Sequence, residues 1–172
     1  MKSHTEKALA SLQELYTPFA TYVVGMSGGV DSSVSAFLLK EAGFHVIGVY
    51  MKNWEETSED GSCTQEDDFR DVVAVSKLLQ IPYYSVNFTK EYQEEVFQLF
   101  LEDIQKGLTP NPDILCNREI KFKKLLERAK KIGGGGLATG HYAKIRRDEE
   151  NRFFLECPKD RMKDQTYFLY TA

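Results

Sequence analysis

Residues 27–33, Ser-Gly-Gly-Val-Asp-Ser-Ser, constrain the fold of this chain more than any other stretch. They follow the apolar residues 22–26 and precede apolar positions at helical spacing, so the sequence predicts a strand, a glycine turn and the start of a helix. Glycines there allow positive φ and bring backbone N–H groups close to an anion, and a helix N-terminus adds about half a positive charge. These features predict a phosphate-binding loop.

The loop does not match the two commonest phosphate-binding motifs. No lysine occurs between Met26 and Leu39, which excludes a Walker A loop, and Gly28-Gly29 lacks the spacing of the dinucleotide-binding fingerprint. A glycine turn with Ser and Asp helix caps would explain the two glycines but not the whole run. The run resembles the PP-loop, Ser-Gly-Gly-x-Asp-Ser, of the ATP pyrophosphatases, which binds the pyrophosphate released when ATP is split into AMP and pyrophosphate.

Short apolar runs alternate with helical patterns along residues 20–140. The expected strands are residues 20–26, 45–52, 83–88 and 137–139. The expected helices are residues 6–16, the stretch from the loop to about 42, the stretch from 64 to the Ile81-Pro82 pair, residues 89–105 and residues 119–132. This alternation predicts an α/β fold, with a doubly wound parallel sheet in three α/β/α layers as in Rossmann-like proteins.

The remaining segments are expected to be loops and a hairpin. Residues 109–113 contain two prolines in three positions and are expected to be a loop, while residues 142–157 suggest a hairpin with its turn at 148–151. The acidic residues 53–61 are expected to form an exposed loop over the carboxyl edge of the sheet, where open α/β sheets bind ligands. An aromatic stripe with helical spacing is expected to pack in the core rather than bind a cofactor. The stripe comprises Tyr92, Val96, Phe100 and Ile104.

The domain organisation follows from the same pattern. Residues 1–18 are expected to be an N-terminal helical extension, and residues 19–172 the phosphate-binding domain. The chain ends in an apolar aromatic run without a closing turn, so we expect it to continue in a longer protein. No apolar run approaches the ~20 residues of a membrane span, and residues 1–6 lack a signal-peptide pattern. A cytoplasmic location without a membrane partner is therefore expected.

Cysteine count and charge exclude further classes. The three cysteines form no CxxC pair, so neither a disulfide framework nor a zinc knuckle is indicated. The net charge of −4 argues against indiscriminate nucleic-acid binding but leaves a local basic face open. Residues 118–131 supply such a stripe, with seven basic residues against two glutamates, and similar stripes are more often solvated faces than RNA contacts.

Cys116 is a candidate reactive thiol. The sequence predicts that it lies just before a helix whose N-cap is Asn117, beside Arg118, and both the helix end and the cation would favour the thiolate. An inert, buried cysteine is the alternative, and the spacing alone leaves both interpretations open.

Four runs together resemble the family of tRNA-specific 2-thiouridylases. They are Gly25–Ser32, Asn111-Pro-Asp113 with Cys116-Asn117, Ala138-Thr-Gly-His-Tyr-Ala143 and Lys163-Asp-Gln165, in the same order as in that family. The resemblance covers most of residues 20–170. It implies an adenine nucleotide alpha hydrolase-like fold of the PP-loop ATP pyrophosphatase type. It also implies an activity: ATP adenylates the C2 oxygen of the wobble uridine of tRNA, and sulfur from a cysteine persulfide then displaces AMP.

The resemblance also assigns roles to residues. It implies ATP contacts at Gly25, Met26, Ser27, Gly28, Gly29, Val30, Asp31, Ser32, Met51 and Gly140. Asp31 is a candidate to position Mg²⁺. The flipped-out target base would meet Asn111, Pro112 and Asp113, with Asp113 handling protons and Cys116 at the position of the nucleophile. The residues implied to contact tRNA are His141, Lys163, Asp164 and Gln165.

Sulfur transfer needs groups outside this chain. The family's second cysteine, which carries the persulfide and can form a disulfide with the first, lies beyond Ala172, and a separate protein donates the sulfur. Cys157 is then a hairpin residue and Cys63 a structural one, and the chain alone is expected to bind ATP without full turnover. Two alternatives stay open: another PP-loop enzyme, such as an amidotransferase synthetase or a tRNA-cytidine thiolase, and an ATP-binding module without turnover.

Overall fold

The structure is a computed structural model of the chain and describes residues 4–15, 20–54 and 64–170. The strands are β1 (Thr21–Met26), β2 (His45–Lys52), β3 (Tyr83–Asn87), β4 (Gly136–Ala138), β5 (Lys144–Arg147) and β6 (Phe153–Glu156). The helices before residue 106 are α1 (His4–Leu15), α2 (Val30–Glu41), α3 (Thr64–Leu79), α4 (Thr89–Tyr92), η1 (Gln93–Phe97) and α5 (Gln98–Gln105). The later helices are α6 (Pro112–Leu115), η2 (Cys116–Lys124), α7 (Leu125–Lys131), η3 (Arg161–Lys163) and α8 (Thr166–Leu169).

The central sheet is parallel, as the sequence predicts. Its strand order is β3-β2-β1-β4, and Val23 on β1 aligns with Ile47 on β2 and with Leu137 on β4. β1 and β2 are nearly continuous apolar runs because helices cover both faces of the sheet. The carboxyl ends of β1, β2 and β4 therefore meet at one edge, where the phosphate loop leaves β1.

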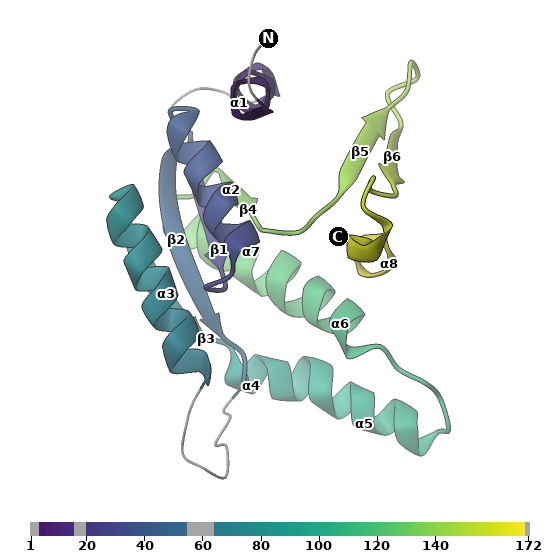
Figure 1. The fold of residues 1–172 in the computed structure, drawn as a ribbon. Helices are drawn as coiled ribbons and strands as arrows, with labels where there is room; N and C mark the ends of the chain where they lie inside the picture. The colour runs from purple at the N-terminus through teal and green to yellow at the C-terminus, as the bar shows by residue number, and fades with distance from the viewer. Residues whose placement is uncertain (1–3, 16–19, 55–63, 171–172) are drawn as a thin grey trace.

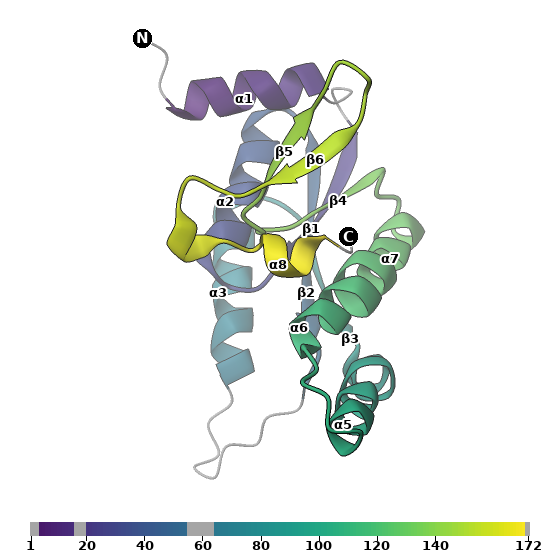
Figure 2. The ribbon, with the colours of Figure 1, turned by 90° about the vertical axis from the view of Figure 1, so that its right-hand side faces the viewer.

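Two hydrophobic clusters lie on opposite faces of the sheet. Neighbouring residues of β1 point to opposite faces, so Val24 packs in the cluster beneath α2 and α3, and Val23 packs in the cluster beneath η2 and α7. Both valines are fully buried. Figures 1 and 2 show the resulting layers, with α2 and α3 on one side of the sheet and α4 to α7 on the other. The doubly wound three-layer fold is confirmed.

The predicted hairpin forms and projects from the sheet. β5 and β6 pair antiparallel, with Arg147 opposite Phe153 (Figure 1). The turn is closed by Asp148, whose carboxylate accepts hydrogen bonds from the backbone N–H groups of Glu150 and Arg152. The chain then returns through η3 to α8, which contacts α6.

The helix expected from residue 119 begins seven residues earlier, and the loop expected at 109–113 ends at Asn111. Asn111 is the N-cap, its side chain accepts from the backbone N–H of Asp113, and Pro112 occupies the first helical position. Proline is favoured at that position because its missing N–H would have no helical partner. Pro112, directly after the N-cap Asn111, thus marks a helix start rather than a loop. The element continues through η2 and α7 to Lys131.

The four glycines at 133–136 form a packed connection. Gly133 has φ +87° and ends α7, while the N–H of Gly134 donates to the carbonyl of Ala129. A Cβ at Gly134 would lie 2.7 Å from a methyl of Val23, and a Cβ at Gly136 would lie 2.5 Å from the ring of Tyr22. The run therefore allows β4 to approach β1 closely.

Several predictions fall outside the described residues. They concern Cys63 and most of the acidic segment 53–61. The boundary expected at residues 18 and 19 stays a prediction, although Leu9 and Leu12 of α1 pack against the core. Within residues 4–15, 20–54 and 64–170, no helix has the length and apolar character that crossing a membrane requires.

Candidate active site

The phosphate loop, Ser27–Gly29, joins the end of β1 to the start of α2. Gly28 has φ +81°, and a Cβ there would lie 2.7 Å from the carbonyl oxygen of Asp68 on α3. Both the positive φ and the close approach of α3 require glycine at this position.

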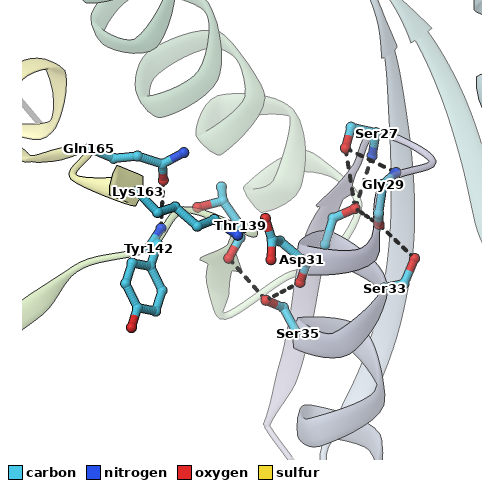
Figure 3. A network of polar contacts seen from close by, with 10 residues as sticks. Ser27, Gly29, Asp31, Ser33, Ser35, Thr139, Tyr142, Lys163 and Gln165 are labelled. Atoms are coloured by element: carbon cyan, nitrogen blue, oxygen red, sulfur yellow. Dashed lines mark hydrogen bonds and ion pairs between the residues drawn. The ribbon is translucent and has the colours of Figure 1, made fainter. Parts of the chain in front are cut away.

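Serine hydroxyls hold the loop in a tight turn (Figure 3). Ser32 is 4% exposed, its Oγ donates to the carbonyl of Gly29, and the same Oγ accepts from the backbone N–H of Ser27. The Oγ of Ser33 also donates to the carbonyl of Gly29, at 2.9 Å. These bonds position the loop from within α2.

The N-terminus of α2 fits an anion. Gly29 is the N-cap, no side chain caps this helix, and the first-turn N–H groups have no partner within the helix. The helix dipole adds a partial positive charge at that point. The loop and the helix end therefore form a suitable site for the phosphates of a nucleotide.

Gly140, after β4, closes the other side of the site. A Cβ at Gly140 would lie 2.5 Å from the backbone nitrogen of Ser32, so only glycine lets this turn reach α2. The carbonyl of the preceding Thr139 accepts a hydrogen bond from Ser35 on α2 (Figure 3). The turn after β4 is thereby attached to the helix that carries the phosphate loop.

A cavity of about 230 Å³ lies between these segments and collects most of the residues implied to bind ATP. We call it the loop cavity. Of the predicted residues, Gly25, Met26, Ser27, Gly29, Asp31, Ser32, Met51, Gly140, His141 and Gln165 line it. Gly28 of the loop and Val30, the first residue of α2, do not line the cavity, and Val30 is 77% exposed. Thr139 and Lys121 line the cavity and were not predicted to do so.

Asp31 forms an ion pair with Lys163, which lies 132 residues later in the sequence. The ammonium of Lys163 lies 2.6 Å from its carboxylate (Figure 3), and Gln165 accepts from the backbone N–H of Tyr142 at 2.6 Å. Among the described residues no group of three or more potential metal ligands occurs. Mg²⁺ is commonly held by one or two carboxylates together with substrate phosphates, so Asp31 fits a metal that arrives with a nucleotide.

A second hollow, of about 490 Å³, contains Cys116, and we call it the thiol hollow. Its lining residues are Asn53, Trp54, Tyr92, Phe97, Phe100, Pro112, Cys116 and Lys121. Trp54 meets the rings of Tyr92 and Phe97 edge to face at 5.7 and 5.2 Å between centroids. The predicted core stripe is thus only partly a core feature, because Val96 is buried whereas Tyr92 and Phe100 line this hollow.

The prediction that the surroundings of Cys116 favour its thiolate is wrong, because the pKa of this thiol is raised. Cys116 lies inside the helix that begins at Pro112, not before its N-terminus, and Arg118 is paired with Glu119 at 2.7 Å. Burial raises the pKa of the Cys116 thiol above its usual value, the Lys121 ammonium lowers it, and the Asp113 carboxylate raises it. Lys121 is therefore the cation that favours the thiolate.

The predicted base-contacting residues lie at the start of the same helix. Pro112 lines the thiol hollow, while Asn111 and Asp113 are exposed beside it. Asn117, 1% exposed, is not a cap: its amide donates to the carbonyl of Asp113, one turn earlier, at 2.9 Å. This bond braces the turn that carries Cys116.

The residues predicted to face tRNA lie close to the loop cavity. His141 is half-buried between the rings of Phe122 and Phe168, and its Nδ1 is 2.8 Å from the Oγ1 of Thr139. Burial, aided by Lys121, lowers the pKa of His141 to about 4. Asp164 accepts two hydrogen bonds from Thr166 at the start of α8.

Comparisons with known proteins give a family match and similar named proteins. Residues 20–172 match the family model described as the tRNA methyl transferase HUP domain. The chain is 57% identical over 147 residues to tRNA-specific 2-thiouridylase MnmA of Limosilactobacillus reuteri and 56% identical to that of Staphylococcus carnosus, covering 86% of this chain in each case. It spans about two fifths of the length of these relatives (39% and 40%).

A solved structure shows the same fold. The U34-tRNA thiolase NcsA from Methanococcus maripaludis superimposes with a TM-score of 0.56 at 24% identity, over 80% of this chain and 44% of that one. At that identity the likeness concerns the fold alone.

Proposed function

Because the chain belongs to the family described as the tRNA methyl transferase HUP domain, we propose that it is the ATP-binding part of a tRNA uridine 2-sulfurtransferase. Its curated relatives are named as tRNA-specific 2-thiouridylases, and its site combines a phosphate loop with a thiol. That combination favours sulfur transfer over methyl transfer. The proposal rests on one observation above all: the loop cavity and the thiol hollow adjoin at the carboxyl edge of one sheet and share Lys121.

ATP is proposed to bind with its phosphates at the loop and the N-terminus of α2. The C2 oxygen of the target uridine attacks the α-phosphorus, the bond to the β-phosphate oxygen breaks, and pyrophosphate leaves at the loop. Mg²⁺ held by the phosphates and Asp31 would neutralise charge on the departing pyrophosphate. Gly25, Met51 and Gly140 border the remaining space, which suits the adenosine.

The target base is proposed to enter the thiol hollow from the side of Asn111, Pro112 and Asp113. Its aromatic walls suit a base taken out of its stack, since flipped bases are bound between aromatic and apolar side chains. Asp113 is exposed and acts electrostatically on Cys116, and we propose that it exchanges protons with the base or with this thiol.

Sulfur is proposed to come from a persulfide on a second cysteine, loaded by a donor protein. Its terminal sulfur attacks C2 of the adenylated base, the C2–O bond breaks, and AMP leaves with the electron pair. The thiolate of Cys116 then attacks the inner sulfur, forming a disulfide with the second cysteine and leaving the transferred sulfur on the uridine. The two cysteines are oxidised as the transferred sulfur is reduced, so electrons balance.

The basic stripe at 118–131 is proposed to contribute to tRNA binding only in part. Arg118 and Lys123 pair with Glu119, and Lys124 pairs with Glu95. These pairs leave the end of α7, with Arg128, Lys130 and Lys131, as the more strongly positive portion. Phosphate contacts there would make tRNA affinity fall with salt.

An assay of AMP release tests the proposal. ATP, Mg²⁺ and a sulfur donor are incubated with unmodified tRNA, with free cytidine or with amino-acid acceptors, using both this chain and a version extended to the length of its relatives. We expect AMP release to depend on tRNA and thiouridine to form with the extended version. AMP release driven by a small acceptor would instead support another PP-loop enzyme, and ATP binding without AMP release would support a binding module.

A further inference from the structure

Lys121 lies between the two halves of the site, and its side chain lines both the loop cavity and the thiol hollow. It is half-buried on η2, whereas the other basic residues of η2, Arg118, Lys123 and Lys124, form ion pairs with glutamates. Within the described residues Lys121 forms no such pair. Its charge is therefore free to act on whatever occupies the two spaces.

The π-helical geometry of η2 explains how Lys121 comes to face the thiol. Lys121 is five residues after Cys116, and in an α-helix that spacing places two side chains about 140° apart around the axis. In a π-helix the hydrogen bonds run from residue i+5 to residue i, so residue i+5 lies one turn above residue i. The last such bond of η2 runs from the N–H of Leu125 to the carbonyl of Ile120.

Among the charges around Cys116, that of Lys121 lowers the pKa of the thiol and so opposes the effect of burial. Asp113 raises the pKa of the thiol, and Tyr92, whose own pKa is raised by burial, faces the thiol as a neutral phenol. Lys121 acts in the opposite direction on Cys116 and also lowers the pKa of His141 at the loop cavity. One ammonium thus acts on groups in both spaces.

We propose that Lys121 is a catalytic residue that serves both steps, by binding the α-phosphate of the nucleotide in the loop cavity and by stabilising the thiolate of Cys116. This inference rests on the proposed function. When sulfur attacks C2 and the C2–O bond breaks, the electron pair passes to a phosphate oxygen of AMP. The ammonium stabilises that oxygen by charge and keeps its own protons.

The test uses the 172-residue chain with Cys63→Ser and Cys157→Ser, so that Cys116 is its one thiol. Two quantities are measured: the rate of alkylation of Cys116 by iodoacetamide as a function of pH, and the dissociation constant of AMP. The variants are Lys121→Met, Lys121→Gln, Lys121→Arg and, as a matched control, Lys123→Met. Lys123 lies on the same helix, and its ammonium is paired with Glu119.

Removing the charge from Lys121 is expected to lower alkylation at pH 7.5 about fivefold to tenfold and to weaken AMP binding by a similar factor, in line with the loss of one charged hydrogen bond. Lys121→Arg is expected to restore both quantities, and Lys123→Met to change neither. Lys121→Gln serves if the Met variant does not fold. A change in only one quantity, no change in either, or an Arg variant that behaves like Met would overturn the proposal. Neither measurement needs tRNA. Failure of the proposed function, seen as absent thiouridine synthesis, can therefore be distinguished from failure of this proposal.

Discussion

The Nζ atom of Lys163 lies 2.6 Å from Oδ2 of Asp31, so two residues 132 positions apart in the sequence meet at the first turn of α2 (Figure 3). The same Nζ lies 5.6 Å from the centre of the Tyr142 ring. Both partners of the ion pair are partly exposed, so it contributes less than about 1 kcal/mol to stability. The position of this ion pair matters more than its energy, because Lys163 binds the same Asp31 carboxylate that we propose as a ligand of Mg²⁺.

Lys163→Met should therefore change metal dependence more than stability. Without the Lys163 ammonium, Mg²⁺ can bind Asp31 without first displacing a bound cation. We therefore expect half-maximal ATP binding at a lower Mg²⁺ concentration, measured by calorimetric titration. Lys159→Met, a change to an exposed lysine of the same segment, is the control and should leave the Mg²⁺ midpoint unchanged. An Mg²⁺ midpoint that does not move in Lys163→Met would show that the pair does not compete with the metal.

Gly28→Ala should abolish ATP binding, whereas Gly107→Ala should not. Both glycines have positive φ, 81° and 75°, which costs an alanine about 1–2 kcal/mol. At Gly107 nothing lies within 4 Å of an added Cβ, but at Gly28 the Cβ would lie 2.7 Å from the backbone of Asp68. Fluorescent-nucleotide titration together with urea unfolding separates the two effects. Equal loss of ATP binding in both variants would refute the role given to this close approach.

Protonation of His141 should destabilise the fold in mild acid. Its pKa is about 4 in the folded chain against an ordinary 6.5, so between these pH values the unfolded chain binds a proton that the folded chain does not. The unfolding free energy then falls as the pH drops from 6.5 towards 4. Because the ring is partly exposed, we expect about 1 kcal/mol of loss by pH 5.

Urea unfolding at pH 7.5 and pH 5 measures this loss. His141→Gln should remove most of it, whereas a change at the exposed His45 should retain it. The prediction fails if His141→Gln loses as much stability on acidification as the unchanged chain.

Local sequence patterns predicted the sheet, the loop and the hairpin because each depends on neighbouring residues. The apolar run that became β1, the glycines of the loop and the turn at Asp148 are such features. The prolines at 110 and 112 predict a loop because proline breaks a helix interior, but the N-cap asparagine before Pro112 gives a local signal for a helix start.

Other parts of the site depend on tertiary structure and carry no local signal. The pairing of Lys163 with Asp31 requires the chain to return from the hairpin to α2. Lys121 faces Cys116 because this segment is π-helical, and the spacing of apolar residues does not predict a π-helix. Trp54 and Tyr92 meet beside the thiol only because the end of β2 lies next to the helix after β3.

Cys116→Ser should separate nucleotide binding from sulfur transfer. Cys116 does not line the loop cavity, so we expect the dissociation constant of ATP to change less than about twofold, within roughly 0.4 kcal/mol. In a version extended to the length of the relatives, however, serine cannot form the disulfide that releases sulfur to the base, and thiouridine should be undetectable by mass spectrometry of digested tRNA. Cys157→Ser is the matched control, because Cys157 is exposed, lines neither the loop cavity nor the thiol hollow, and should leave thiouridine formation unchanged. Thiouridine formed by the Cys116→Ser variant would show that the thiol beside the aromatic hollow is not the group that resolves the persulfide.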